Sequence, residues 1–144
     1  MTALLPGAPR SVEAAEFWDA MADGRLLVQQ CVHCGRWRAP RTVTCPDCGC
    51  WDSRWLPPPG PARLVTCTVV RRAPSAEWGE HAPYGVAIVE PAPGCRLLAG
   101  TDWLPDAADL GRPVVVTVVA GEGGPRLVAS RAEEKDTDGA ETTA

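Results

Sequence analysis

The chain has 144 residues, 45% of them hydrophobic and 22% charged, and a formal net charge of −4. This length holds one ordinary domain or two very small ones, and the composition is that of a globular chain, which excludes coiled coils, fibrous proteins and wholesale disorder. The longest apolar run, 114–120, is far shorter than the roughly 18 residues of a membrane helix. The start of the sequence lacks the cationic and apolar stretches of a signal peptide, so we expect a cytoplasmic protein.

The net charge lies in one short segment. Residues 1–60 and 61–131 are each neutral, so residues 132–144 carry the whole charge of −4. That segment has no branched aliphatic or aromatic residue, which predicts a disordered acidic tail. Residues 1–10 contain two prolines and predict a flexible arm. The neutral body lacks the basic surface of a general nucleic-acid binder.

A helix is predicted from Val12 to Ala22. Ser11 is a good N-cap, and Gly24 follows the last turn. Three- and four-residue spacings bring apolar side chains to one side of this helix: Ala14, Phe17, Trp18 and Met21. This stripe either packs into the core or faces another chain, so Phe17 and Trp18 are candidate partner-binding residues.

Seven cysteines, an odd number without a secretion signal, argue against a disulfide framework. Cys31-Val-His-Cys34-Gly and Cys45-Pro-Asp-Cys48-Gly are two matching CxxCG units. In each unit two thiolates can reach one metal ion, while the glycine accepts the left-handed turn that follows. The two units together predict one tetrahedral site with four cysteine ligands: Cys31, Cys34, Cys45 and Cys48.

Zinc is the preferred metal at this site, with iron as the alternative, because a CPxCG unit also resembles half of a rubredoxin site. Four thiolates leave zinc no position for water, so we expect one structural zinc ion per chain. Cys50 is an alternative to Cys48 as the fourth ligand, and His33 is expected to face solvent. Large apolar side chains near the cysteines are expected to supply much of the core of this small module: Trp37, Trp51 and Trp55.

A proline-rich linker, 57–61, divides the chain. We therefore expect a helix and metal ribbon over 11–56, entered by a strand at 25–30, and a second unit over 62–131. Strand patterns in the second unit fall at 63–71, 84–90, 95–99, 113–119 and 125–130, with room for one helical turn between the third and fourth. Five strands in this arrangement predict an OB-type barrel, with another small β-barrel as the alternative.

The loop 71–83 is longer than a hairpin needs, which is often a sign of function. Trp78 and His81 in this loop are candidate contacts for a partner or ligand, and Arg71 and Arg72 beside it are candidates for the phosphates of coenzyme A, with a solvated strand end as the alternative. No hydrolase, metalloprotease or nucleotide-site motif occurs in the sequence. We therefore expect no catalytic residues and no enzyme activity of the chain on its own.

The order of these features resembles the zinc-ribbon/OB-fold family once called domain of unknown function 35. The resemblance extends from about residue 13 to 130 and is carried by Phe17-Trp18, Gly24-Arg25-Leu26, the two CxxCG units, Thr68-Val69-Val70, Pro83-Tyr84 and Leu110-Gly-Arg-Pro113-Val114. It implies a mainly β protein in which an N-terminal helix and a rubredoxin-like zinc ribbon precede a five-stranded OB-fold barrel.

The resemblance also implies a role. Members of this family commonly act as non-catalytic partners of thiolase-fold enzymes, which condense, transfer or cleave acyl groups, or of acyl-CoA hydratases. The chain is thus expected to be an accessory subunit in a hetero-oligomer, with acyl-CoA as a shared ligand. Single-stranded nucleic-acid binding is the rival function, because zinc ribbons and OB barrels serve it elsewhere, but the neutral barrel argues against it.

Overall fold

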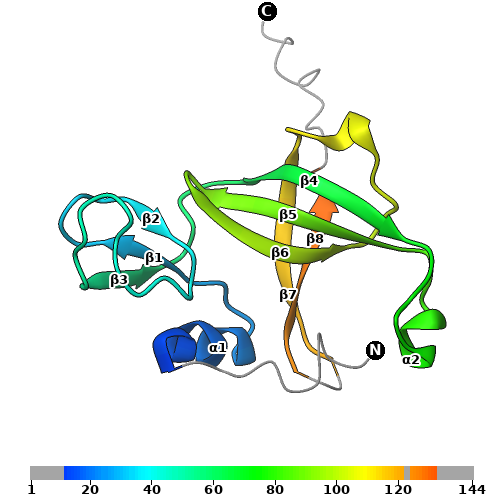
Figure 1. Cartoon of the computed structure of the whole chain (residues 1–144), viewed down its shortest axis with the longest axis horizontal. Helices are drawn as coiled ribbons and strands as arrows, with labels where there is room; N and C mark the ends of the chain where they lie inside the picture. Colours follow the sequence, from blue (N-terminus) through cyan, green and yellow to red (C-terminus); the bar gives the residue numbers. More distant parts are fainter. Residues whose placement is uncertain (1–11, 122–123, 133–144) are drawn as a thin grey trace, which may run out of the picture.

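We describe a computed structural model of the chain for residues 12–121 and 124–132. The segments predicted to be an arm (1–10) and an acidic tail (132–144) lie outside the described residues, apart from Ala132, and so does the predicted N-cap Ser11. A small three-stranded sheet and a closed barrel lie side by side, as Figure 1 shows, with the helix α1 at the edge of the small sheet. The predicted fold class, mainly β with an N-terminal helix, is confirmed.

The N-terminal helix forms where the sequence predicts it. A 3-10 turn, η1 (Val12–Ala14), leads into α1 (Ala15–Ala22). Gly24 follows with a φ of 80°, a left-handed conformation that ends the helix. The buried side of the helix joins the main core through Phe17, which is 8% exposed, and Met21.

The small sheet has the strand order β2-β1-β3 and is antiparallel throughout. Its strands are β1 (Val28–Cys31), β2 (Trp37–Arg38) and β3 (Ser53–Leu56). The predicted strand at 25–30 therefore begins later, at Val28, and continues into the first metal-binding unit. Trp37 and Trp55 pack against the core as expected, but Trp51 is 73% exposed, so its predicted place in the core was wrong.

The barrel consists of β4 (Ala62–Val70), β5 (Tyr84–Ala92), β6 (Cys95–Thr101), β7 (Pro113–Val119) and β8 (Arg126–Arg131). Its order is β4-β5-β6-β8-β7, and β7 closes the barrel against β4. The β6–β8 pair is parallel and all the others are antiparallel. Between β6 and β7 lies a 3-10 turn, η2 (Ala107–Asp109), at the predicted place. This connectivity confirms the OB-type barrel.

A bulge changes which side chains of β4 point inward. The pairing of β4 with β5 shifts between Leu64 and Thr66. Leu64 is fully buried, whereas beyond the bulge Cys67 is the less exposed residue and Thr66 faces solvent. A simple alternation along this strand would keep Leu64 and Thr66 on one face. The residue inserted at the bulge therefore changes which side chains of β4 point into the barrel.

Helix α1, the small sheet and the barrel share one hydrophobic core. Val28 of β1 belongs to the same buried cluster as Leu64, Val89 and Val114 of the barrel. The proline-rich segment 57–61 joins β3 to β4. Within the described ranges, no helix combines the length and the apolar character that crossing a membrane requires.

Candidate metal centre and barrel pocket

Each CxxCG unit folds into a tight turn that presents its two sulfurs to one point. The N–H of Gly35 donates to the carbonyl of Cys31 at 3.1 Å, and the N–H of Gly49 donates to that of Cys45 at 2.9 Å. Both glycines have a positive φ, 75° and 74°, which few other residues adopt without strain. The two turns are thus equivalent, as the matching sequences predict.

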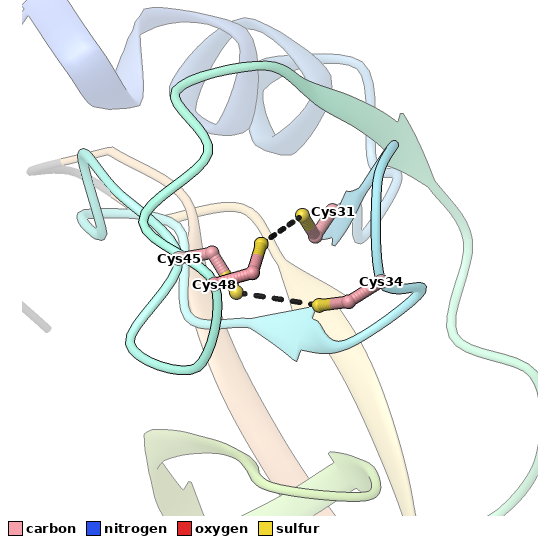
Figure 2. A group of neighbouring side chains, drawn as sticks. All are labelled: Cys31, Cys34, Cys45 and Cys48. Carbon is pink, nitrogen blue, oxygen red and sulfur yellow. Dashed lines mark hydrogen bonds between the residues drawn. The ribbon is translucent and has the colours of Figure 1, made fainter.

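The four cysteines predicted as ligands lie together (Figure 2). The sulfurs of Cys31 and Cys48 are 3.6 Å apart, those of Cys34 and Cys45 are 3.5 Å apart, and all four lie within 4.8 Å of one another. A tetrahedron with Zn–S bonds of about 2.3 Å has edges of about 3.8 Å. The sulfur positions therefore fit a zinc ion, and the all-thiolate set leaves no position for a catalytic water.

The thiols of the cluster differ in acidity. The pKa of Cys31 is lowered to about 6, chiefly because the N–H of Cys34 donates to its sulfur. The pKa of Cys45 is lowered in the same way by the N–H of Cys48. At Cys48 the N–H of Cys50 lowers the pKa, but burial and the neighbouring thiols outweigh it and raise the value to about 12. A divalent cation would relieve the repulsion that opposes full ionisation of the cluster.

Cys50 and His33 lie outside the cluster of sulfurs. The thiol of Cys50 faces the carbonyl of Asp52 at 3.8 Å, and its own carbonyl accepts from the N–H of Cys45 at 2.9 Å. His33 is exposed, as expected. Cys50 therefore stabilises the second turn through its backbone, and in this arrangement Cys48 supplies the fourth sulfur.

Polar side chains that the sequence analysis did not single out hold the cysteine turns in place. Arg36, in the first turn, pairs with Asp47, in the second, at 2.7 Å. The buried side chain of Gln29 donates to the carbonyl of Pro40 at 2.9 Å and accepts from Ser53. The buried guanidinium of Arg38 donates to carbonyls on both sides of the second turn, including that of Asp52 at 3.2 Å. These contacts cross between loops, so no local sequence pattern could have indicated them.

The long loop 71–83 folds over one end of the barrel. It contains a single helical turn, α2 (Ala76–Gly79), whose first turn is capped by the Ser75 side chain accepting from the N–H of Trp78. The ring of Trp78 lies 5.2 Å from that of Tyr84 and 6.1 Å from that of His81. The two loop residues that the sequence singled out therefore lie together.

Beneath this loop lies a cavity of about 410 Å³, which we call the barrel pocket. It is lined by loop residues and by residues of β5, β6 and β8: Pro74, Trp78, His81, Tyr84, Gly85, Val86, Leu98, Ala99, Gly100, Thr101, Arg126 and Leu127. Arg71 and Arg72, the predicted phosphate contacts, are exposed and are not among these residues. The arginine that lines the pocket is Arg126, which the sequence analysis did not single out because its partners in the pocket are distant in sequence.

Asp109, which the sequence places simply in a helical turn, is a buried anchor of the η2 segment. Its carboxylate accepts from the indole N–H of Trp103 at 3.1 Å and from the N–H of Asp106 at 3.0 Å, and Arg131 pairs with it at 3.3 Å. The Asp106 hydrogen bond first, and then those of Trp103 and Arg131, hold its pKa below the ordinary value of 3.8. The role is structural, since this group ties η2 to the end of β8.

Comparison with known proteins agrees with this architecture. Residues 18–49 match the family described as ChsH2, rubredoxin-like zinc ribbon domain. The probable enoyl-CoA hydratase alpha subunit of Thermomonospora curvata is 32% identical over 102 residues, which cover 69% of this chain and 31% of that protein. The chain therefore spans about a third of the length of this curated relative.

Two solved structures share the fold. The first is described as Ltp2-ChsH2(DUF35) aldolase and has 27% sequence identity and a TM-score of 0.72, with 87% of this chain and 98% of that chain covered. The second, a DUF35 family protein of unknown function from Sulfolobus solfataricus, has 16% identity and a TM-score of 0.59, with 85% and 86% covered. Together these findings confirm the expected resemblance: the chain combines a ChsH2-type zinc ribbon with a barrel, the architecture of the domain of unknown function 35 family.

Proposed function

We propose that the chain is a non-catalytic accessory subunit that docks on a thiolase-fold enzyme acting on acyl-CoA or related thioesters. The observation that carries this proposal is the likeness, over 87% of the chain, to a structure described as an Ltp2-ChsH2(DUF35) aldolase.

The ribbon's part in this function is structural. We propose that Cys31, Cys34, Cys45 and Cys48 hold one zinc ion, and the sulfur spacing described above supports this assignment. The metal would fix the two turns relative to each other, because the small sheet alone has little apolar area to bury. Zinc here stabilises the surface that the subunit presents to its partner.

An acyl-CoA hydratase is the second candidate partner. It is favoured by the 32% identity to a protein described as a probable enoyl-CoA hydratase alpha subunit. Both candidates handle acyl thioesters, so the class of substrate is the same and the identity of the partner subunit distinguishes them.

The predicted docking residues differ in how accessible they are. Phe17 is buried in this chain, whereas Trp18 is half-buried and lies beside it, with ring centres 5.1 Å apart. Trp51, near the second cysteine turn, was not among the predicted docking residues, but its side chain is 73% exposed. Because tryptophan is enriched at binding hot spots, we propose Trp18 and Trp51 as docking contacts and treat Phe17 as core. A role for Arg71 and Arg72 in contacting coenzyme A phosphate stays a proposal, supported by the exposure of both side chains.

The test is affinity purification of the tagged, zinc-loaded chain from its native extract, followed by mass spectrometry and light scattering of the co-eluting complex. We expect a thiolase-fold enzyme at near-equal stoichiometry, and we expect Trp51→Ala to reduce its recovery without lowering the melting temperature. Val12→Ala, at another exposed apolar residue, is the matched control. A hydratase at equal stoichiometry would favour the second candidate. Recovery of nucleic acid or of no partner would contradict both.

A further inference from the structure

The barrel pocket has the size and position of a ligand site. Its volume of about 410 Å³ falls within the range of small-molecule sites, roughly 300–1,000 Å³. Figure 1 shows α2 and its loop at the end of the barrel, beside the ends of β4 and β5. The loop 71–83 therefore forms a wall of the pocket, which accounts for its being longer than a hairpin needs.

Most of the lining is apolar. Trp78 and Tyr84 form an aromatic wall, with ring centres 5.2 Å apart, and Val86 and Leu127 line the barrel side. Leu98, a residue of β6, also lines the pocket, and its side chain is 52% exposed. Apolar surface left open to water in a concave site is surface that a hydrocarbon or aromatic ligand would cover favourably.

One cation lies among these apolar groups. Arg126 is half-buried, and a Cβ atom placed on Gly100 would lie 3.8 Å from its terminal nitrogen Nη1, so the guanidinium lies over this glycine in the pocket wall. Within the described ranges, no carboxylate forms an ion pair with Arg126. A partly desolvated guanidinium that pairs with no carboxylate among the described residues can attract an anionic ligand, and its planar fork matches a carboxylate.

The other polar groups of the pocket are few. The Thr101 hydroxyl already donates to the carbonyl of Trp103 at 2.6 Å. His81 is exposed, and among the residues that the structure describes no second arginine or lysine lines the pocket. A nucleic-acid strand needs a row of cations along its phosphates, whereas one cation beside an apolar wall matches a single anionic group on an apolar body.

We propose that the barrel pocket binds a small amphipathic carboxylate, such as a medium-chain fatty acid. The carboxylate pairs with Arg126, and the hydrocarbon lies against Trp78, Tyr84 and Leu98. This inference does not rest on the accessory-subunit function, because the isolated chain should bind the ligand without its partner enzyme. Failure of one proposal therefore leaves the other intact.

The experiment titrates decanoate into the full zinc-loaded chain, by calorimetry and by amide chemical shifts in NMR, with 1-decanol as the neutral probe. Shifts are expected at 84–86, 98–101 and 126–127. Arg126→Met should weaken decanoate binding about tenfold, the effect of losing one charge-assisted hydrogen bond, and leave decanol binding unchanged. Arg112→Met, at an exposed arginine outside the pocket, is the charge-matched control and should change neither affinity.

A second variant fills the pocket without removing its charge. Gly100 is not in the left-handed region, so it can carry a side chain, and Gly100→Leu should abolish decanoate binding while the far-ultraviolet circular dichroism stays unchanged. The proposal would be overturned by no binding of decanoate, by shifts confined to other parts of the chain, or by decanoate binding that is insensitive to Arg126→Met. Displacement of decanoate by an oligothymidylate would likewise overturn it in favour of a nucleic-acid surface.

Discussion

Replacing Phe17 by alanine tests whether α1 is part of the core or a surface reserved for a partner. The side chain is 8% exposed and belongs to the cluster that joins α1, the small sheet and the barrel. Returning a phenyl side chain to water costs about 2–3 kcal/mol, and the cavity left in an incompletely collapsing site adds about 1 kcal/mol. We therefore expect Phe17→Ala to lower the free energy of unfolding by about 3–4 kcal/mol, a large part of the roughly 5–15 kcal/mol typical of a domain.

The assay is urea unfolding of the zinc-loaded chain, followed by far-ultraviolet circular dichroism at constant zinc. Val12→Ala is the matched control, because Val12 lies in η1, just before the helix, and is 90% exposed; its free energy of unfolding should change by less than about 0.5 kcal/mol. A loss of less than about 1 kcal/mol for Phe17→Ala, with an unchanged denaturant slope, would refute the reasoning. Such a result would mean that α1 does not pack on the core of the free chain.

Three further predictions concern the barrel and the metal centre. Gly85→Ala should lower the free energy of unfolding by about 2–3 kcal/mol in the same urea assay, because the new Cβ would overlap Thr101 Oγ1 and lie 2.6 Å from Pro105 Cδ. The lowered pKa of Asp109 means that its carboxylate stabilises the fold fully above pH 3.8, its ordinary value, and that this contribution is lost as pH falls through the lower folded value. The difference in urea midpoint between the native chain and Asp109→Asn should therefore shrink below pH 3.8. Cys48→Ser should lose most bound zinc during dialysis against a chelator, and Cys50→Ser should keep it, as measured by elemental analysis.

Each of these predictions has a result that contradicts it. For Gly85 the control is Gly100→Ala, whose Cβ would have ordinary contacts at 3.8 Å, and equal stability of the two variants would disprove the steric argument. A midpoint difference for Asp109→Asn that does not shrink as the pH falls below 3.8 would show that its charge is not the stabilising feature. Equal zinc loss from both cysteine variants would place Cys50 among the ligands.

The metal-binding cluster was predictable because its geometry is local. A Cys-x-x-Cys-Gly segment closes its own turn, with the glycine at positive φ and a hydrogen bond back to the first cysteine, whatever surrounds it. Two such turns in one small module converge on one point, so Cys31, Cys34, Cys45 and Cys48 could be chosen before the fold was known. The contacts that support them could not be, because Arg36–Asp47 joins the two cysteine turns and Gln29–Pro40 joins β1 to a separate loop.

The sequence by itself determined the order of elements. Alternating apolar residues in the strands, prolines and glycines in the turns, and a three- and four-residue stripe in the helix are short-range patterns with one favourable local conformation each. They specified the helix, the ribbon and the five barrel strands to within a few residues. The bulge in β4 is the exception, since its position depends on the register with β5.

Only the tertiary structure decided which side chains are buried and which meet in a pocket. Trp51 is as apolar as Trp55, yet it is 73% exposed because none of the described elements packs over it. Asp109 has the sequence of an ordinary turn residue but becomes a buried anchor when β8 brings Arg131 to it. Arg126 meets the wall formed by Trp78 only because β8 pairs with β6 in a closed barrel. Burial and convergence depend on contacts between residues far apart in the chain, and closure of the barrel creates those contacts.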